Sequence, residues 1–266
     1  MSRRRHDSAL RVALCLGLCV APSTFADLRS LDEVLYHATR YANTPERREA
    51  KRMAREELKT RMPEALHAAM GHLHGDHIGL QVLVMEWVLE LPDDLVVPAL
   101  IAYLDDERVE QRRLSAFFLG FKEGAAHAAK LTPLLDHEET RGAALRTLGK
   151  WKVDAVREPA VYWLREGGER LRVVAANALR DLGDPSVLPD LVAAMKDPVF
   201  TVRNAAARAA VSFGDDAVPV LRGQAGEARG NHVRMIRRAL HDLGDDADVF
   251  SIDGTSIIVE SPFFLP

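Results

Sequence analysis

Three stretches of the chain share one pattern: LRVVAANALRDLGDPSVLPDLVAAMKDP (residues 171–198), TVRNAAARAAVSFGDDAVPVLRGQAGEA (201–228) and HVRMIRRALHDLGDDADVF (232–250). Each has an apolar residue followed by arginine near its start, continues through small and branched residues, and reaches Leu-Gly or Phe-Gly. Apolar residues at i, i+3, i+4 and i+7 predict helices that bury one face. The stretches therefore predict an all-α fold.

Recurring residues define the period of this repeat. One arginine recurs every 31 residues, at Arg141, Arg172, Arg203 and Arg234. Glycines recur at intervals of 29 to 34 residues, at Gly120, Gly149, Gly183, Gly214 and Gly244. We expect these glycines to end helices in the left-handed conformation. Prolines recur near the start of the second helix of each repeat, at Pro63, Pro98, Pro133, Pro159, Pro189 and Pro219. Proline is tolerated there because the N–H groups of the first helical turn make no intrahelical hydrogen bond.

With these residues and this period, the chain resembles the HEAT-repeat superfamily, in particular its short HEAT-like repeats of the phycobilisome-lyase type. The resemblance is clear from about Asp94 to Asp245. It implies a right-handed α-solenoid, a superhelix of about six helix pairs, with one helix row convex and the other lining a concave face. We expect N-terminal capping helices over residues 27–61 and the repeat array over residues 62–247.

The last residues, 248–266, break the helical pattern. Asp253-Gly254 lies between two apolar runs, which predicts a type I′ turn and a short C-terminal β-hairpin or extended tail. Because a lone hairpin is marginally stable, we expect it to dock on the last helix pair, or else to pair with the sheet edge of a partner.

The N-terminus is typical of a cleavable signal peptide over residues 1–26. Basic residues precede an apolar run of ten, Val12 to Ala21, and small residues at Thr24 and Ala26 form a cleavage site. A membrane span needs about 20 apolar residues. We therefore predict cleavage after Ala26 and a periplasmic or secreted protein, with an uncleaved anchor or a buried helix as the alternative.

Composition narrows the possible functions. Both cysteines, Cys15 and Cys19, lie in the predicted signal, so the mature chain would have no disulfide, thiol nucleophile or cysteine metal ligand. Removing the four arginines and one aspartate of residues 1–26 from 35 basic and 39 acidic residues leaves a net charge of −7. We therefore expect no nucleic-acid binding. No second long apolar run follows, so we expect no membrane span after cleavage.

The stretch GHLHGDHIG (71–79) matches the ligand motif of metallo-β-lactamase-type hydrolases. Those enzymes need the motif in a loop after a buried strand, whereas both flanks here read as helix. We interpret it as the polar turn of the first repeat. A metal site formed by His72, His74, Asp76 and His77 is the alternative.

No catalytic pattern emerges elsewhere. HEAT-repeat deoxyhypusine hydroxylase binds di-iron through several His-Glu pairs, and this chain has one, His137-Glu138. We found no Ser-His-Asp spacing, P-loop or dinucleotide motif. The sequence therefore predicts a non-enzymatic scaffold without a cofactor. It does not predict an oligomeric state.

The remaining candidate for a functional site is a surface that binds a protein or peptide. Because its predicted contacts are rich in arginine, an acidic partner would suit it. The predicted contacts are Arg208, Arg237 and Arg238, facing the concave groove, and the aromatic residues Trp87 and Trp163, with core packing as the alternative for both tryptophans. We expect the recurring arginines Arg141, Arg172, Arg203 and Arg234 to be structural. They would pair with acids of the preceding turn, namely Asp136, Glu166 and Asp197, as a ladder between repeats.

Overall fold

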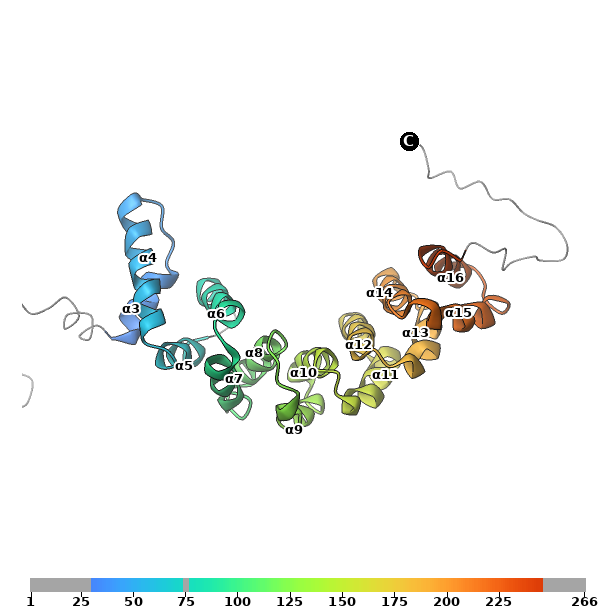
Figure 1. Cartoon of the computed structure of the whole chain (residues 1–266), viewed down its shortest axis with the longest axis horizontal. Coiled ribbons are helices and arrows are strands. Elements are labelled where there is room, and N and C mark those ends of the chain that lie inside the picture. The colour runs from blue at the N-terminus through green and yellow to red at the C-terminus, as the bar shows by residue number, and fades with distance from the viewer. Residues whose placement is uncertain (1–29, 74–76, 246–266) are drawn as a thin grey trace, which may run out of the picture. The chain divides into compact units, whose positions relative to one another are not determined.

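The computed structural model describes residues 30–73 and 77–245, and every regular element among them is a helix (Figure 1). The predicted all-α class is confirmed. The predicted signal peptide and the predicted hairpin lie outside the described residues. The handedness of the superhelix stays a prediction. The chain divides into two compact units at residues 99 and 100, within the predicted repeat array.

In the first unit, α3 packs against the three helices that follow it. Its helices are α3 (Leu31–Thr39), α4 (Pro45–Thr60), α5 (Glu64–Gly71) and α6 (Ile78–Glu90), and α7 (Asp93–Ala102) crosses the division. Side-chain caps fix the first two helix starts. The Oγ of Ser30 accepts from the N–H of Glu33 at 3.1 Å, and the Oγ1 of Thr44 accepts from the N–H of Arg47 at 3.3 Å.

The second unit consists of two rows of helices, which we call the inner row and the outer row after the curve of this unit (Figure 1). The inner row is α8 (Val109–Leu119), α10 (Glu138–Lys150), α12 (Glu169–Leu182), α14 (Phe200–Val211) and α16 (Asn231–Asp242). The outer row is α9 (Ala128–Leu131), α11 (Arg157–Glu166), α13 (Leu188–Ala194) and α15 (Ala217–Ala225). Short 3₁₀ turns adjoin the outer helices, namely η1 (Ala125–His127), η2 (Thr132–Leu135), η3 (Asp154–Val156), η4 (Pro185–Val187) and η5 (Gly214–Asp216).

Successive inner helices pack on one another, and each inner helix from α10 to α16 also packs on the outer segment before it. Small residues allow the close approach. A Cβ on Gly149 of α10 would lie 2.6 Å from the carbonyl oxygen of Ala178 and 2.8 Å from its Cα, in α12. On the other side, the fully buried Thr147 donates its hydroxyl to the carbonyl of Ala116 in α8 at 2.6 Å. One turn of α10 is therefore tied to both neighbouring helices.

The recurring glycines serve two different purposes. Gly183 ends α12 with φ of +73°, and Gly214 and Gly244 also have positive φ, as expected for left-handed helix ends. The expectation is wrong for Gly120, whose φ is −65°, and for Gly149, which lies inside α10. Both are positions of close packing, because a Cβ on Gly120 would lie 2.8 Å from the Oγ1 of Thr147.

We expect Gly149→Ala to destabilise the protein by about 1–3 kcal/mol, because the added methyl group meets the backbone of α12. Chemical denaturation followed by circular dichroism would measure the change. Gly223→Ala in α15 is the matched control. A Cβ added at Gly223 would meet no other segment of the chain within 4 Å, so this variant should gain about 0.5–1 kcal/mol from helix propensity. Equal effects of the two substitutions would contradict the close-packing interpretation.

Candidate functional site

The recurring arginines bind the backbone at the end of the preceding outer segment. The Nε of Arg141 donates to the carbonyl of Leu135 at 2.8 Å, and its Nη2 donates to that of Asp136 at 3.2 Å. Arg203 donates from Nη1 to the carbonyls of Asp197 and Pro198, at 2.8 and 2.9 Å. Leu135 ends η2, and Asp136, Asp197 and Pro198 lie in the turns that follow, where a carbonyl needs a hydrogen-bond partner from outside the helix. Each arginine therefore fixes an inner helix to the chain segment that enters it.

Arg172 makes the same kind of contact and adds a link to the next repeat. Its Nη1 donates to the carbonyl of Gly167 at 2.7 Å. Its Nε lies 2.8 Å from Oδ2 of Asp197, and its Nη2 donates to Oδ1 at 3.2 Å. Both side chains are nearly buried, with 16% and 11% of their surface exposed, so solvent screens this pair only weakly.

These contacts differ from the predicted ladder in their partners. The arginines bind backbone carbonyls, not the carboxylates of Asp136 and Glu166. Only Asp197 binds one of these arginines through its carboxylate, and its partner is Arg172, which precedes it in the chain. The exposed side chain of Arg234 makes no hydrogen bond or ion pair with another residue of the described ranges. In that repeat Arg229 donates instead to the carbonyls of Gly226 and Ala228.

Arg112 is a further member of this series that the sequence analysis missed. Its Nη1 donates to the carbonyls of Asp106 and Glu107 at 2.7 and 3.1 Å, six and five residues back, as in Arg141 and Arg203. It precedes Arg141 by 29 residues, the same interval that separates Gly120 from Gly149. That shared interval is the signal that could have identified it.

Basic side chains elsewhere on the second unit form ion pairs with carboxylates of neighbouring segments. Lys130 pairs with Asp105 at 2.7 Å, Arg157 with Asp184 at 2.5 Å, and Arg222 with Asp245 at 2.5 Å. Arg165 of α11 also pairs with Asp190 of α13. At least one side chain of each pair is partly exposed to solvent, which screens the attraction and limits its contribution to stability. Their consequence is that much of the positive charge beside the outer row is neutralised.

Two of the predicted partner-binding arginines line one groove on the inner row. This α14–α16 groove is lined by Asn204, Ala207, Arg208, Val211, Ser212, Arg238 and Asp242. Arg208 is exposed and has no ion pair or hydrogen bond from its side chain to another described residue. The Nε of Arg238 lies 3.9 Å from Oδ2 of Asp242, at the limit of an ion pair. Arg237 is exposed on the same helix but does not line the groove.

The two predicted tryptophan contacts have different outcomes. Trp87 has 1% of its surface exposed, so it packs in the core of the first unit, as the alternative had it, and cannot present its ring to a partner. Trp163 lies on α11 of the outer row, not on the concave face, and the guanidinium of Arg141 stacks 3.9 Å from its ring centroid. The ring of Trp163 is partly exposed in a groove that Tyr162 and Arg141 also line, so its role as a partner contact stays a prediction.

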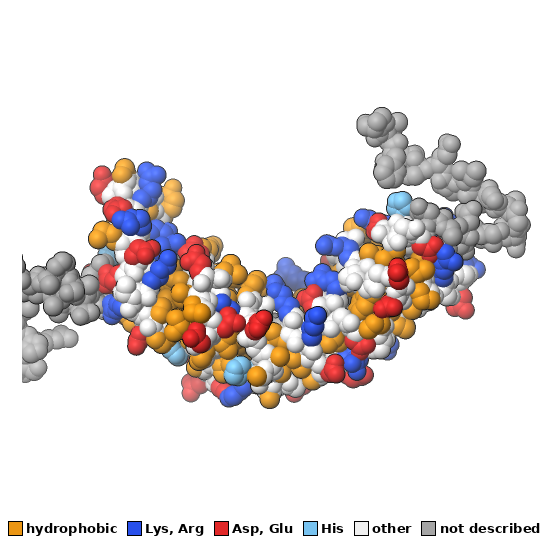
Figure 2. Space-filling model, in the orientation of Figure 1, with side chains coloured by type: hydrophobic (Ala, Val, Ile, Leu, Met, Phe, Trp, Pro, Cys, Tyr) orange, Lys and Arg blue, Asp and Glu red, His pale blue; other side chains and the backbone are white. Residues whose placement is uncertain are grey.

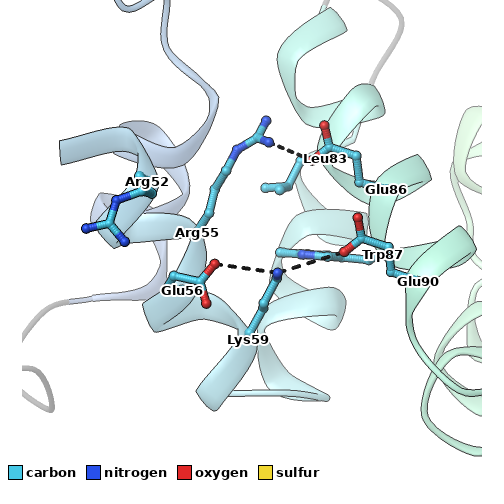
Figure 3. A pocket seen from close by; sticks show the side chains of 8 residues that line it. All are labelled: Arg52, Arg55, Glu56, Lys59, Leu83, Glu86, Trp87 and Glu90. Carbon is cyan, nitrogen blue, oxygen red and sulfur yellow. Dashed lines mark hydrogen bonds and ion pairs between the residues drawn. The ribbon is translucent and has the colours of Figure 1, made fainter. Parts of the chain in front are cut away.

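The groove above Trp87, between α4 and α6, is bridged by opposite charges (Figure 3). Arg55 pairs with Glu86 at 2.7 Å, and Lys59 lies 3.8 Å from Glu90. The charged face of α4 therefore faces acids of α6 in part. This arrangement pairs Arg55 and Lys59 with carboxylates of the same unit.

The His-rich turn lies partly outside the described residues, because His74 and Asp76 fall in the gap. The Nε2 of His72 lies 2.9 Å from Oδ1 of Asp32 on α3, and His77 immediately precedes α6. Within 30–73 and 77–245, no three His, Cys, Asp or Glu side chains cluster as a metal site would require. The four-residue metal site stays a prediction. In the same ranges, no helix is both long and apolar enough to span a membrane.

Comparison with known proteins identifies the repeats. The family model described as HEAT repeats matches residues 128–209 and 157–241. No curated protein sequence matches the chain significantly. Among solved structures, the chain is similar to YibA of Escherichia coli, at 19% identity over 92% of this chain and 88% of that chain, with a TM-score of 0.49. Two engineered proteins are similar at 17% identity. They cover 82% and 80% of this chain and 98% and 68% of their own, with TM-scores of 0.43 and 0.44.

We expect Arg203→Met to lower the free energy of unfolding by about 1–3 kcal/mol, because the carbonyls of Asp197 and Pro198 lose a charged donor. Arg234→Met is the matched control, since that guanidinium binds no other described residue, and it should change stability by less than about 0.5 kcal/mol. Thermal and urea unfolding would measure both. Equal stability of the two variants would show that the carbonyl contacts do not support the repeat.

Proposed function

We propose that this protein, whose residues 128–241 are HEAT repeats, is a non-enzymatic scaffold that binds a protein or peptide through the inner row of its second unit. HEAT repeats generally mediate protein interactions, and stacked helix pairs provide extended surfaces for them. We place the contact with the partner at arginine side chains of this row.

The observation that carries the proposal is an exposed arginine on the inner row whose charge no described carboxylate compensates. Basic residues beside the outer row meet carboxylates, as Arg157 meets Asp184 and Arg165 meets Asp190. On the inner row, Arg208 is exposed with no such partner among the described residues. In the view of Figure 2, Lys and Arg side chains gather along the inner edge of this unit, above α10 and α12. Positive charge that lacks a carboxylate partner attracts negative charge.

The α14–α16 groove provides a place for that charge. Arg208 and Arg238 approach it from neighbouring helices, Asn204 and Ser212 add neutral polar groups, and Asp242 lies 3.9 Å from Arg238. The lining also includes the buried Ala207, whose side chain is small. Two arginines against one aspartate leave the groove with a net positive charge, which suits the carboxylates of an acidic peptide. Such complementarity increases the association rate and selects the partner.

We also propose that the protein acts outside the cytoplasm. The support is in the sequence: basic residues, ten apolar residues and Thr24-Phe25-Ala26 occur in the order of a signal peptide. The absence of cysteine from residues 27–266 means that no disulfide could form in these residues after export.

We expect the double variant Arg208→Glu, Arg238→Glu to capture its partner at least tenfold less well, because like charges replace attraction in the groove. Capture of proteins from the cell-envelope fraction, identified by mass spectrometry, would measure the loss against the wild type. Tenfold corresponds to about 1.4 kcal/mol of binding free energy.

The matched control is Arg170→Glu, Arg234→Glu, which changes the net charge equally at two exposed positions that do not line the groove. Its capture should remain within about twofold of the wild type, since only long-range charge has changed. Circular dichroism of both variants should show unchanged helicity. If the groove variant captures its partners as the control does, the inner-row proposal is wrong.

Expression of the full chain in a bacterial host should yield a mature protein that begins at Asp27. N-terminal sequencing and intact mass of the periplasmic fraction would measure this. Replacement of Ala26 by a bulky residue, Ala26→Leu, should block processing because the cleavage site needs a small residue there. An intact Met1 on wild-type protein recovered from the cytoplasm would refute export.

A further inference from the structure

Arg146 of α10 packs against two aromatic rings, one in α8 and one just after that helix. Its guanidinium carbon lies 4.7 Å from the ring centroid of Phe117 and 5.3 Å from that of Phe121. All three side chains are partly exposed. The guanidinium makes no hydrogen bond or ion pair with any residue in 30–73 or 77–245. It therefore has a fixed position and unused N–H donors.

Lys150 adds a second positive charge one helical turn later. Its Nζ donates to the carbonyl of Gly120 at 3.0 Å and lies 4.4 Å from the ring centroid of Phe121. The pKa of Lys150 is lowered by partial burial and by the nearby positive charges of Arg146 and Arg180, while Asp181 acts in the opposite direction. Bringing an anion close to this cluster would relieve that repulsion.

The carboxylate that acts on Lys150 is already engaged. Asp181 accepts from Nε and Nη2 of Arg180 at 2.9 and 2.7 Å. It does not lie within ion-pair distance of Arg146 in the described structure. Arg146 therefore has no carboxylate partner among the described residues, and Lys150 shares the influence of Asp181 with Arg180.

Stacking alone does not account for this arrangement. A cation over an aromatic ring at a partly exposed site contributes about 0.5–1 kcal/mol, and it uses the face of the guanidinium, not its N–H edge. Arg208 follows Arg146 by 62 residues, which is two periods of 31, so the two arginines occupy the same position of the repeat. The side chain of Arg208 likewise forms no hydrogen bond or ion pair within the described ranges. The same inner-row position thus carries an unpaired arginine in two repeats.

We propose that Arg146 and Lys150, supported by Phe117 and Phe121, form a carboxylate-binding site that holds an acidic peptide segment of the partner. This inference rests on the proposed scaffold function and adds a second anchoring point to the α14–α16 groove.

The planar fork of a guanidinium matches a carboxylate in two parallel hydrogen bonds, and the aromatic rings restrict its motion before binding. Less side-chain entropy is then lost when the peptide binds. A neutral peptide offers no charge to the cluster. The site therefore selects for Asp or Glu side chains, and the two anchoring points together favour an acidic segment long enough to follow the inner row.

The test uses a fluorescein-labelled peptide of eight glutamates and its eight-glutamine counterpart, with the full-length mature protein and fluorescence anisotropy at low salt. We expect the glutamate peptide to bind and the glutamine peptide not to bind. Arg146→Gln should weaken binding at least tenfold, and Arg146→Lys, which keeps the charge but loses the fork, should give an intermediate value. Arg234→Gln is the control for net charge and should leave binding within about twofold.

An independent measurement follows the side-chain nitrogen of Lys150 by NMR. Its pKa should rise when the glutamate peptide is added, because a carboxylate now stabilises the charged form. This observation does not require a variant to fold, so it remains decisive if Arg146→Gln unfolds. An unchanged pKa of Lys150 in the presence of bound peptide would overturn the proposal.

Failures of the two proposals are distinguishable. If Arg146→Gln binds the glutamate peptide normally while Arg208→Glu, Arg238→Glu does not, the Arg146 site is wrong and the scaffold proposal stands. If neither change affects binding, the inner row is not the binding surface and both proposals fail. If inorganic phosphate displaces the peptide at equal concentration, the cluster is a small-anion site, which overturns its assignment to a peptide carboxylate.

Discussion

Direct stacking of one inner helix on the next is the constraint on which the rest of the second unit depends. At α10 this contact needs glycine on one side, where Gly149 meets the backbone of Ala178, and a buried hydroxyl on the other, where Thr147 binds Ala116. A helix pair cannot bury both of these faces by itself, so each repeat depends on its neighbours. The arginine contacts with backbone carbonyls then set how each inner helix meets the segment before it. A regular row of exposed positions follows from these two features.

That regular row explains why similar basic residues have different roles. Arg172 is turned toward the next repeat and pairs with Asp197, whereas Arg146 and Arg208, on another face of the same row, have no acidic partner in the described structure. Charge used between repeats supports the array, and charge left on the inner face is available to a ligand. The net charge of −4 conceals this separation, because it sums both faces.

Repeat spacing predicted the helices and the register of the arginines, including positions that bind carbonyls. It did not predict their partners, because a guanidinium reaches backbone atoms that have no signature in the sequence. It also misplaced Trp87, since a tryptophan in a helix looks the same whether it covers a core or a partner. For His72, the neighbours in sequence are other histidines, but the neighbour in space is Asp32, forty residues earlier.

The sequence by itself determined the all-α class, the two-helix period and the HEAT-repeat register, because helix periodicity and turn residues act over a few positions of the chain. Only the tertiary structure decided which charges are compensated. The partner of Arg172 lies 25 residues away, and the ring under Arg146 lies 29 residues away on another helix. Such distances are closed by packing between repeats, so the candidate binding surface is visible only once the helices are stacked.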